Sequence, residues 1–578
     1  MKGAPRSKVF DDIYFSQDDG LAESQFVFLK GNNLPARWQA REIFTICETG
    51  FGTGLNFLMA WQAFENEPGQ CKRLNFISFE QYPLSIDEIR EALSPWGDVF
   101  GEKIDQYLQQ YPLRIPGVHQ MCVSEGIYLT LIFDDINEAI PKLSGAGVDA
   151  WFLDGFNPAK NPEMWTQNVF ENMARLSRSD AQFATFTAAG FVKRGLQAAG
   201  FDVQKTQGFG RKRERLVGVL QIGTQDKEVN SIRSVAIIGA GLAGTSAAYW
   251  FKKQGVTPVI FEKGADVGMG ASGNIRGMVN PRLSKLRTKE SNYYMQAYAM
   301  AIREMRNISL KHDIEFEPCG ALHIMHNDDM RARYPSMVEQ WGWHKDHAYL
   351  VDKDQASDIA GIKVEQGALY LPDAAGVNPY KLCKAYTADV EVRFNTTIDN
   401  ITQNTQGQWN VGGQAFDAII LASAMGVHNI EQARNLCEKV DLYPVRGQIS
   451  VAKPSDASAK IKTMMNYKGY MSPVINGVHV VGSTFKRHDM VLDVRDEDHK
   501  HVLQLAREAI PALNNCDLEI VSGRASHRVS TKHRFPLFQN VTHNMFVSTG
   551  HGSHGLVSSI QSSAIIHNQL CSGLKLYE

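Results

Sequence analysis

The chain has 578 residues, too many for one ordinary hydrophobic core, so its length predicts two to four domains. With 43% hydrophobic and 21% charged residues and a formal net charge of -2, it is globular in composition and not a global polycation. No stretch approaches the roughly 18 apolar residues of a membrane span, and the polar N-terminus predicts no signal peptide. We therefore expect a cytoplasmic protein that does not bind membranes. Eight single cysteines, without a Cys-x-x-Cys pair, are typical of reduced thiols.

The first glycine-rich turn follows an apolar, β-prone run over 43–47. Gly50, Gly52 and Gly54 permit a tight turn and a close approach of the backbone to a ligand. Glu48, at the end of the run, can meet a cation or an amine. The glycine spacing differs from the dinucleotide pattern. It favours S-adenosylmethionine, whose amino-acid portion has an ammonium group but no phosphate.

Three further apolar runs in the first half each end in an acid. The runs and their acids are 74–79 with Glu80, 128–133 with Asp134 and Asp135, and 148–153 with Asp154. Glu80 is placed to accept ribose hydroxyls, and Asp135 to reach an adenine amino group. A single acid of this kind often only caps a strand or a helix. Four in series indicate a doubly wound sheet with its ligand site at the carboxyl edge.

The segments DDIYFSQDDGLAESQFVFLKGNNLPARW (11–38), ETGFGTGLNF, FLDGFNPAKNPEMW and TFTAAGFVKRGLQAAGF (185–201) carry a family resemblance. They resemble the methyltransferase half of the bacterial bifunctional enzymes that make 5-methylaminomethyl-2-thiouridine in tRNA. The resemblance implies a class I Rossmann-like methyltransferase domain over residues 1–222, with Asp154 beside the acceptor amine. The residues that it implies for S-adenosylmethionine are Glu48, Gly50, Gly52, Gly54, Glu80 and Asp135.

Methyl transfer from a sulfonium is an in-line displacement, so catalysis consists largely of positioning the reactants. A primary alkylamine is mostly protonated at neutral pH and must lose a proton to become a nucleophile. We expect Asp154 to accept that proton or to orient the neutral amine. The loop over 157–165 is expected to supply the pocket, where Trp165 either stacks on the base or packs in the core.

Residues 223–232 are polar and lack periodicity, which predicts a linker. The segment SVAIIGAGLAGTSAAYWFKKQGVTPVIFEKG follows: an apolar strand, Gly239-x-Gly241-x-x-Gly244, a helix, and a second strand that ends in Glu262. This order is the dinucleotide fingerprint, in which the pyrophosphate lies at the helix N-terminus and the acid binds ribose hydroxyls. A glutamate at position 262 disfavours a 2′-phosphate.

Two later segments favour FAD over NAD. GMGASGNIRGMVNP (268–281) is a small-residue loop of the kind that lines a flavin, and MFVSTGHGSHGLVSS (545–559) is a strand, a glycine-rich turn and a helix. The flavin contacts expected from them are Ser272, Gly273, Gly550, Gly552 and Gly555. His551 and His554 leave a metal site open as an alternative. The glycine-rich setting favours flavin, and we expect no metal.

The second half resembles glycine oxidase and D-amino-acid oxidase relatives throughout, and the oxidoreductase half of the same bifunctional family. The resemblance implies a FAD-binding Rossmann-type domain over 233–578, with a β-rich α+β substrate domain at roughly 285–390 and 430–535. It also implies oxidative removal of a carboxymethyl group from an amine. Hydride transfer to the flavin gives an imine, which water splits into glyoxylate and a primary amine.

An arginine is the expected anchor of the substrate carboxylate, because a guanidinium binds a carboxylate through two hydrogen bonds. In GRASHRVSTKHRFPLF (523–538) the resemblance assigns this role to Arg528, with Arg524 as second choice. Lys285 and Arg446 are the next candidates. A surface ion pair is the alternative for each of these arginines.

The expected function is modification of a tRNA wobble uridine. The second half exposes a primary aminomethyl group and the first half methylates it, with no obligatory protein partner. Two alternatives stay open: an amino-acid oxidase fused to an unrelated methyltransferase, and a tRNA-binding scaffold with decayed sites. Two basic clusters are candidates for phosphate contacts or are ordinary solvated faces. Their members are Arg211, Lys212, Arg213 and Arg215, and Arg524, Arg528, Lys532 and Arg534.

Overall fold

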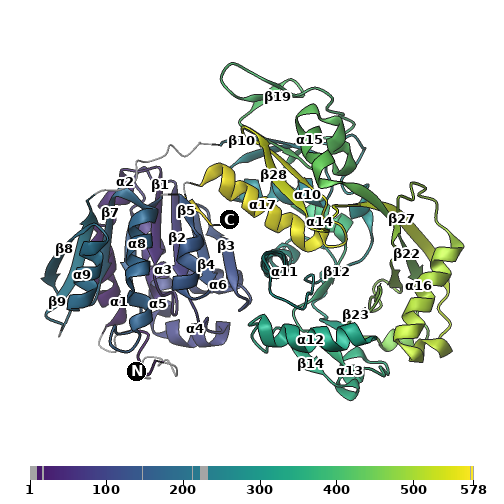
Figure 1. The fold of residues 1–578 in the computed structure, drawn as a ribbon, viewed down its shortest axis with the longest axis horizontal. Helices are drawn as coiled ribbons and strands as arrows, with labels where there is room; N and C mark the ends of the chain where they lie inside the picture. The colour runs from purple at the N-terminus through teal and green to yellow at the C-terminus, as the bar shows by residue number, and fades with distance from the viewer. Residues whose placement is uncertain are drawn as a thin grey trace. The chain divides into compact units, whose positions relative to one another are not determined.

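The computed structural model describes residues 10–15, 19–145, 147–210, 212–221, 232–572 and 574–576. The chain divides into two compact units, Met1–Asn230 with Cys571–Glu578, and Ser231–Leu570. Figure 1 shows most of the first unit in purple to blue and the second in teal to yellow. None of the helices in the described ranges has the length and apolar character needed to cross a membrane.

The first unit is built on an eight-stranded sheet in the order β3-β4-β2-β1-β6-β7-β9-β8. The strands from β4 to β7 are parallel, and β3, β9 and β8 add antiparallel pairings at the two edges. The strand order reverses between β1 and β6, which is where a doubly wound sheet binds its ligand. The strands are β1 (Ile43–Glu48), β2 (Arg73–Phe79), β3 (Gly117–Ser124), β4 (Ile127–Phe133), β6 (Val148–Leu153), β7 (Ser177–Thr185), β8 (Phe201–Gln207) and β9 (Glu214–Leu220).

Side chains along a strand alternate between the two faces of the sheet. Phe44 and Ile46 of β1 therefore enter one buried apolar cluster, together with Phe57 of α3, whereas Cys47 enters the other, together with Val169 of α8. Both faces are thus covered, as the predicted α/β fold requires. The helices of this unit are α1 (Gly20–Ser24), α2 (Ala36–Gln39), α3 (Leu55–Asn66), α4 (Ile86–Leu93), α5 (Gly97–Phe100), α6 (Lys103–Gln110), α7 (Ile136–Ala139), α8 (Gln167–Leu176) and α9 (Gly190–Ala198).

The last described residues of the chain belong to the first unit. β30 (Leu574–Lys575) pairs antiparallel with β5 (Ser144–Gly145). Leu574 and Leu576 are 4% and 6% exposed and join the apolar cluster that contains α8. This placement differs from the expected boundary, which gave the whole of 233–578 to the second half. The first unit holds this segment because Leu574 and Leu576 are buried in its core.

The second unit contains a six-stranded sheet in the order β17-β11-β10-β21-β29-β28. All pairs in it are parallel except β28 with β29. The helix α10 (Leu242–Lys253) follows β10, and α17 (Gly555–Cys571) follows β29. This sheet and its helices form the Rossmann-type fold that was predicted for the second half. Its strands are β10 (Ser234–Ile238), β11 (Thr257–Phe261), β17 (Glu391–Arg393), β21 (Ala418–Leu421), β28 (Leu537–Thr542) and β29 (Met545–Thr549).

A second, nine-stranded sheet of this unit runs β14-β15-β13-β23-β24-β25-β22-β26, with β27 also paired to β22. Its strands are β13 (Ala321–Ile324), β14 (Tyr349–Val351), β15 (Ala368–Leu371), β22 (Tyr443–Ala452), β23 (Met464–Asn466), β24 (Tyr470–Met471), β25 (His479–Gly482), β26 (Lys486–Arg487) and β27 (Ile520–Ser530). Short strands elsewhere are β12 (Gly277–Val279), β16 (Ala375–Val377), β18 (Thr402–Gln403), β19 (Trp409–Val411) and β20 (Gln414–Phe416).

Helices α13 and α16 pack on the nine-stranded sheet through Ala356 and Val502. In contrast, α15 contributes Ala433 and Cys437 to the apolar cluster of the six-stranded sheet. The start of the expected substrate range 430–535 therefore packs with the cofactor-binding sheet. The remaining helices are α11 (Lys289–Ser309), α12 (Asp328–Gln340), α13 (Lys353–Ala360), α14 (Pro379–Tyr386), α15 (Glu431–Val440) and α16 (Asp496–Ala509).

Candidate active sites

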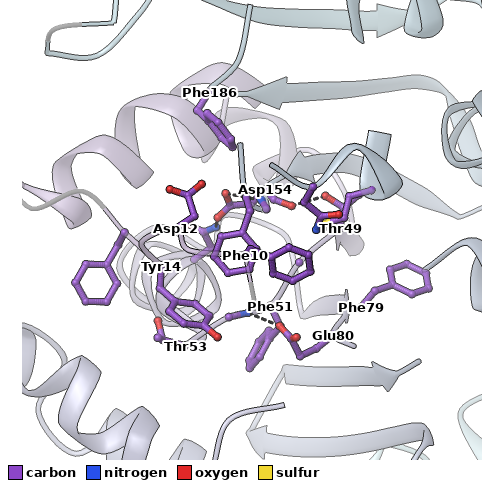
Figure 2. A pocket seen from close by; sticks show the side chains of 18 of the residues that line it. Phe10, Asp12, Tyr14, Thr49, Phe51, Thr53, Phe79, Glu80, Asp154 and Phe186 are labelled. Carbon is purple, nitrogen blue, oxygen red and sulfur yellow. Dashed lines mark hydrogen bonds between the residues drawn. The ribbon is translucent and has the colours of Figure 1, made fainter. Parts of the chain in front are cut away.

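A cavity of about 380 Å³ lies at the carboxyl edge of the first sheet. The turns that follow β1, β2, β4 and β6 all contribute to its wall. Figure 2 shows Thr49, Glu80 and Asp154, which come from three of these turns, around this cavity. Parallel strands bring their carboxyl ends to one edge, so acids far apart in the sequence meet there. The structure thus brings together five of the residues expected at this site: Gly50, Gly52, Glu80, Asp135 and Asp154.

The turn after β1 is tied to the acid after β2. Gly52 has φ +54°, a conformation that favours glycine. Its N–H donates to Glu80 Oε2 at 2.9 Å, and the N–H of Tyr82 donates to Glu80 Oε1 at 2.8 Å. Burial raises the pKa of Glu80. On the next strand, Asp135 lines the cavity and accepts the N–H of Asn137 at 2.8 Å, which caps α7.

Asn56, in the first turn of α3, bridges two carboxylates. Its Nδ2 donates to Glu48 Oε1 at 2.8 Å and to Asp154 Oδ2 at 2.7 Å. Glu48 is fully buried, also accepts the hydroxyl of Ser78 at 2.7 Å, and does not line the cavity. Burial, followed by the charge of Asp154, holds the pKa of Glu48 well above its usual range. Glu48 therefore acts on the cavity through Asn56, which the sequence analysis did not select.

Asp154 is held on both of its carboxylate oxygens. Oδ1 accepts the N–H of Gly155 at 2.8 Å, and Oδ2 accepts the Asn56 amide. Burial raises the pKa of Asp154 to about 6, and these two hydrogen bonds oppose the rise. A carboxylate with this pKa is mostly ionised at neutral pH and is a stronger base than an ordinary one.

Aromatic side chains surround the first cavity (Figure 2). The ring of Phe156 lies 4.9 Å from that of Phe10 and 5.4 Å from that of Tyr14, centroid to centroid. Trp165 is 4% exposed, donates its Nε1 to the carbonyl of Phe156 at 3.3 Å and does not line the cavity. Of the two readings of Trp165, the structure supports packing in the core.

The first basic cluster separates into different environments. Lys212 lines the cavity, lies 4.7 Å above the ring of Phe186 and pairs with Glu23 at 2.7 Å. Arg215 is 7% exposed and donates to the carbonyl of Val27 at 2.9 Å. Arg213 is exposed, and Arg211 lies outside the described residues.

This wall fits S-adenosylmethionine. Glu80 is placed for ribose hydroxyls at the end of β2, and the glycine turn leaves room beside it. Asn56 Oδ1 is buried and has no hydrogen-bond partner within the described residues, so the wall lacks a donor that an ammonium group supplies.

A second cavity, of about 880 Å³, lies in the second unit at the carboxyl ends of β10 and β11. Its wall includes seven of the expected flavin contacts: Gly239, Gly241, Glu262, Ser272, Gly550, Gly552 and Gly555. Gly244 and Gly273 do not line this cavity. A Cβ on Gly244 would stand 1.8 Å from the carbonyl oxygen of Gly239, so this glycine permits close packing of helix on strand.

The glycine turn of the second unit is tied to an acid as in the first. Glu262 Oε2 accepts the N–H of Ala240 at 2.7 Å, and Oε1 accepts that of Gly264 at 2.8 Å. Ser272 Oγ accepts the N–H of Leu242 at 2.9 Å, which joins the 268–281 loop to the N-terminus of α10. Backbone N–H groups at a helix N-terminus suit a pyrophosphate.

The polar groups on the wall of the second cavity also fit FAD. Four buried polar atoms on its wall have no hydrogen-bond partner within the described ranges: Ser423 Oγ, Tyr467 Oη, His554 Nδ1 and Ser559 Oγ. His551 instead bonds to the hydroxyls of Ser558 at 2.8 Å and Ser548 at 3.3 Å. In the described part of the chain, no three His, Cys, Asp or Glu residues gather as metal ligands.

Arg528 and Arg524 lie on the same strand, β27, but have different surroundings. Arg528 lines the cavity, donates to Ser483 Oγ at 2.7 Å, and has no carboxylate within ion-pair distance among the described residues. Burial lowers its pKa. Arg524 donates to the carbonyls of Met269 at 3.0 Å and Gly270 at 2.6 Å and does not line the cavity. Of these two arginines, therefore, only Arg528 faces the cavity.

The other anchor candidates are less suited. Arg446 is fully buried and pairs with Asp498 at 2.5 Å, and Lys285 is exposed away from the cavity wall.

A Cβ on Gly447 would lie 2.1 Å from Arg528 Nη1, so the glycine in YPVRGQISV leaves space for that guanidinium. The sequence analysis also did not select Lys468, Tyr470 or Phe485, which line the same cavity. Only the sheet pairing brings them to it.

Two family models match the chain. A model described as S-adenosyl-L-methionine-dependent methyltransferase matches residues 99–221, and a model described as FAD dependent oxidoreductase matches residues 234–566. Fold, cavities and matches together define a methyltransferase fused to an oxidoreductase, with S-adenosylmethionine and FAD as cofactors.

Curated relatives match along almost the whole chain. The tRNA 5-methylaminomethyl-2-thiouridine biosynthesis bifunctional protein of Methylobacillus flagellatus is 34% identical over 96% of this chain and 90% of its own length. Those of Marinomonas sp. and Idiomarina loihiensis are 34% and 35% identical, over 98% and 99% of this chain and 92% and 95% of their own lengths. The chain belongs to this family of bifunctional tRNA-modification proteins.

Solved structures of oxidoreductases are similar in fold to part of this chain. Glycine oxidase from Bacillus cereus has a TM-score of 0.50 at 20% identity, and it covers 58% of this chain and 94% of its own. L-proline dehydrogenase from P. horikoshii has a TM-score of 0.51 at 14% identity, and it covers 59% of this chain and 94% of its own. At these identities the likeness concerns the fold alone.

Proposed function

We propose that the two units act in sequence on the wobble uridine of tRNA. The second unit removes the carboxymethyl group from 5-carboxymethylaminomethyl-(2-thio)uridine. The first unit then methylates the exposed amine to give 5-methylaminomethyl-(2-thio)uridine. The observation that carries this proposal is the pair of cavities. One has an arginine without an acidic partner, suited to the carboxylate that is lost, and the other has a basic carboxylate, suited to the amine that is methylated.

In the oxidative step, Arg528 binds the substrate carboxylate and so positions the adjacent methylene. FAD, when bound, would supply the acceptor for the hydride from that methylene carbon. The residues that would hold it line the cavity, with Gly241 and the N-terminus of α10 for the pyrophosphate and Glu262 for the ribose. Burial lowers the pKa of His554 to about 4, so this imidazole stays neutral beside Arg528. Water then splits the substrate imine into glyoxylate and the primary amine.

In the methylation step, Asp154 accepts a proton from the alkylammonium group and orients the neutral amine. Asn56, itself on the cavity wall, holds the carboxylate in place. S-adenosylmethionine, when bound, supplies the methyl group, and Glu80, Asp135 and the turn of Gly50 and Gly52 would hold it. The order of the two steps follows from the chemistry, because only the first step produces the amine that the second one consumes.

The proposal is tested by mass spectrometry of tRNA nucleosides from cells whose own copy is replaced by variants. Asp154→Ala is expected to accumulate the 5-aminomethyl form, because oxidation still proceeds. Arg528→Ala is expected to accumulate the 5-carboxymethylaminomethyl form while the purified protein keeps its flavin. A reversed pattern would show that the roles of the two units are exchanged.

Arg524→Ala is the matched control for Arg528→Ala. Since Arg524 holds the backbone of the 268–281 loop, its loss is expected to weaken flavin binding and not carboxylate binding. The rival function, oxidation of free amino acids, predicts instead that the purified protein oxidises N-methylglycine well and leaves modified tRNA unchanged. A tRNA substrate is also consistent with the expected cytoplasmic location.

A further inference from the structure

Phe485 stands on the wall of the second cavity with 57% of its surface exposed. It directly precedes β26, and the guanidinium carbon of Arg528 lies 5.2 Å from the centroid of its ring. A single exposed apolar residue is common on protein surfaces and needs no explanation by itself. Here, however, the ring adjoins the proposed carboxylate anchor, so any substrate held by Arg528 lies close to it.

Lys468 lines the same cavity from the turn between β23 and β24. It is exposed, and it has no ion pair or side-chain hydrogen bond among the residues that the structure describes. The cavity wall therefore carries both an open aromatic ring and an unpaired cation. Proteins hold unpaired nucleotides with these two groups, since a base stacks on the ring and the cation meets a phosphate.

The substrate side chain is long enough for a base on Phe485 to reach Arg528 with its carboxylate. Four bonds join the pyrimidine ring to the carboxylate carbon of a carboxymethylaminomethyl group, which is roughly 5 Å when extended. The ring centroid of Phe485 and Cζ of Arg528 are 5.2 Å apart. Because Arg528 lies over one face of the Phe485 ring, a pyrimidine stacks on the other face, and its side chain reaches the guanidinium past the edge of the ring.

We propose that Phe485 and Lys468 form a nucleotide platform for the oxidoreductase unit. The unpaired uridine of the RNA stacks on Phe485, a phosphate of the same strand pairs with Lys468, and the amine side chain extends to Arg528. The inference rests on the proposed function and deepens it. It names the groups that select an RNA nucleotide over a free amino acid of similar chemistry.

The test compares Phe485→Ala, Phe485→Tyr and Lys468→Ala in the full-length flavoprotein. The substrates are tRNA with 5-carboxymethylaminomethyluridine, the same free nucleoside, and N-methylglycine. Phe485→Ala is expected to raise KM for tRNA and nucleoside roughly ten- to a hundredfold, as for the loss of one stacked base, and Phe485→Tyr to restore it. Lys468→Ala is expected to raise KM for tRNA only, and to reduce the salt dependence of binding by about one phosphate contact.

Tyr349→Ala and Lys462→Ala are the matched controls, because both residues are exposed on the same unit and neither lines the cavity. Flavin absorbance confirms that each variant is folded. If Phe485→Ala slows the oxidation of N-methylglycine as much as that of the nucleoside, the ring only shapes the cavity, and the proposed platform is refuted.

Binding of an RNA stem-loop with an unpaired uridine separates this inference from the proposed function. Wild-type protein that binds the stem-loop but leaves the modified tRNA unoxidised contradicts the proposed function. Equal binding of the stem-loop by wild type and Phe485→Ala contradicts the platform, whatever the turnover.

Discussion

At the scale of single residues, a glutamate and a glycine turn recur in both units. Glu80 Oε2 accepts the N–H of Gly52 at 2.9 Å, and Glu262 Oε2 accepts the N–H of Ala240 at 2.7 Å. Each acid directly follows the second strand of its unit, and each turn follows the first strand. The carboxylate therefore orders the turn in addition to facing the ribose.

The bridge through Asn56 predicts a pH effect on methylation. Its hydrogen bond lowers the pKa of Asp154, so Asn56→Ala raises that pKa above about 6. Because only ionised Asp154 accepts the proton, the acid limb of kcat/KM moves to higher pH, by about one unit for one lost hydrogen bond. The measurement is the pH profile of methylation at saturating S-adenosylmethionine.

Asn75→Ala is the control for this shift. Asn75 Nδ2 donates to Thr45 Oγ1 at 3.3 Å on the same sheet, away from the cavity wall. Its loss should leave the pH profile in place. A uniform fall in rate at every pH for Asn56→Ala would mean that Asn56 supports the fold and not the ionisation of Asp154.

At the scale of secondary-structure elements, the position of β30 predicts that this strand stabilises the first unit. Leu574 is buried in the cluster around α8, so Leu574→Ala leaves a cavity in the first unit. Replacing a fully buried Leu by Ala lowers the free energy of unfolding by about 2–5 kcal/mol. We expect a value in the lower part of this range, because residues near a chain end are less firmly held. Calorimetry should show a lower melting temperature for the first unit, with the temperature of flavin release unchanged.

Leu310→Ala is the comparison, since Leu310 is 67% exposed and in the second unit. If Leu574→Ala lowers the temperature of flavin release but not the melting of the first unit, β30 does not stabilise the unit with which it pairs.

At the scale of the whole molecule, two compact units with separate cavities predict separable activities. Gly241→Leu tests this. Gly241 has φ -77°, which any residue adopts, and a Cβ there stands 3.4 Å from Ser272 Oγ, so the new side chain fits the backbone and fills cofactor space. We expect a colourless protein that still methylates tRNA carrying the 5-aminomethyl group. Loss of both activities would contradict two independent units.

The two cofactor turns and the acids at the strand ends could be predicted from the amino-acid sequence alone. Glycine spacing and strand-end position are local properties, and a parallel sheet brings such ends to one edge whatever packs around it. Glu80, Asp154, Gly241 and Glu262 therefore line the cavities in which the sequence analysis expected them.

The tertiary structure alone decided which arginine faces the second cavity, what joins Glu48 to Asp154, and which unit holds the end of the chain. Arg524 and Arg528 are four residues apart on one strand, and only their neighbours, a loop backbone for one and a cavity for the other, distinguish them. Such outcomes depend on contacts between segments distant in sequence, which local patterns do not encode.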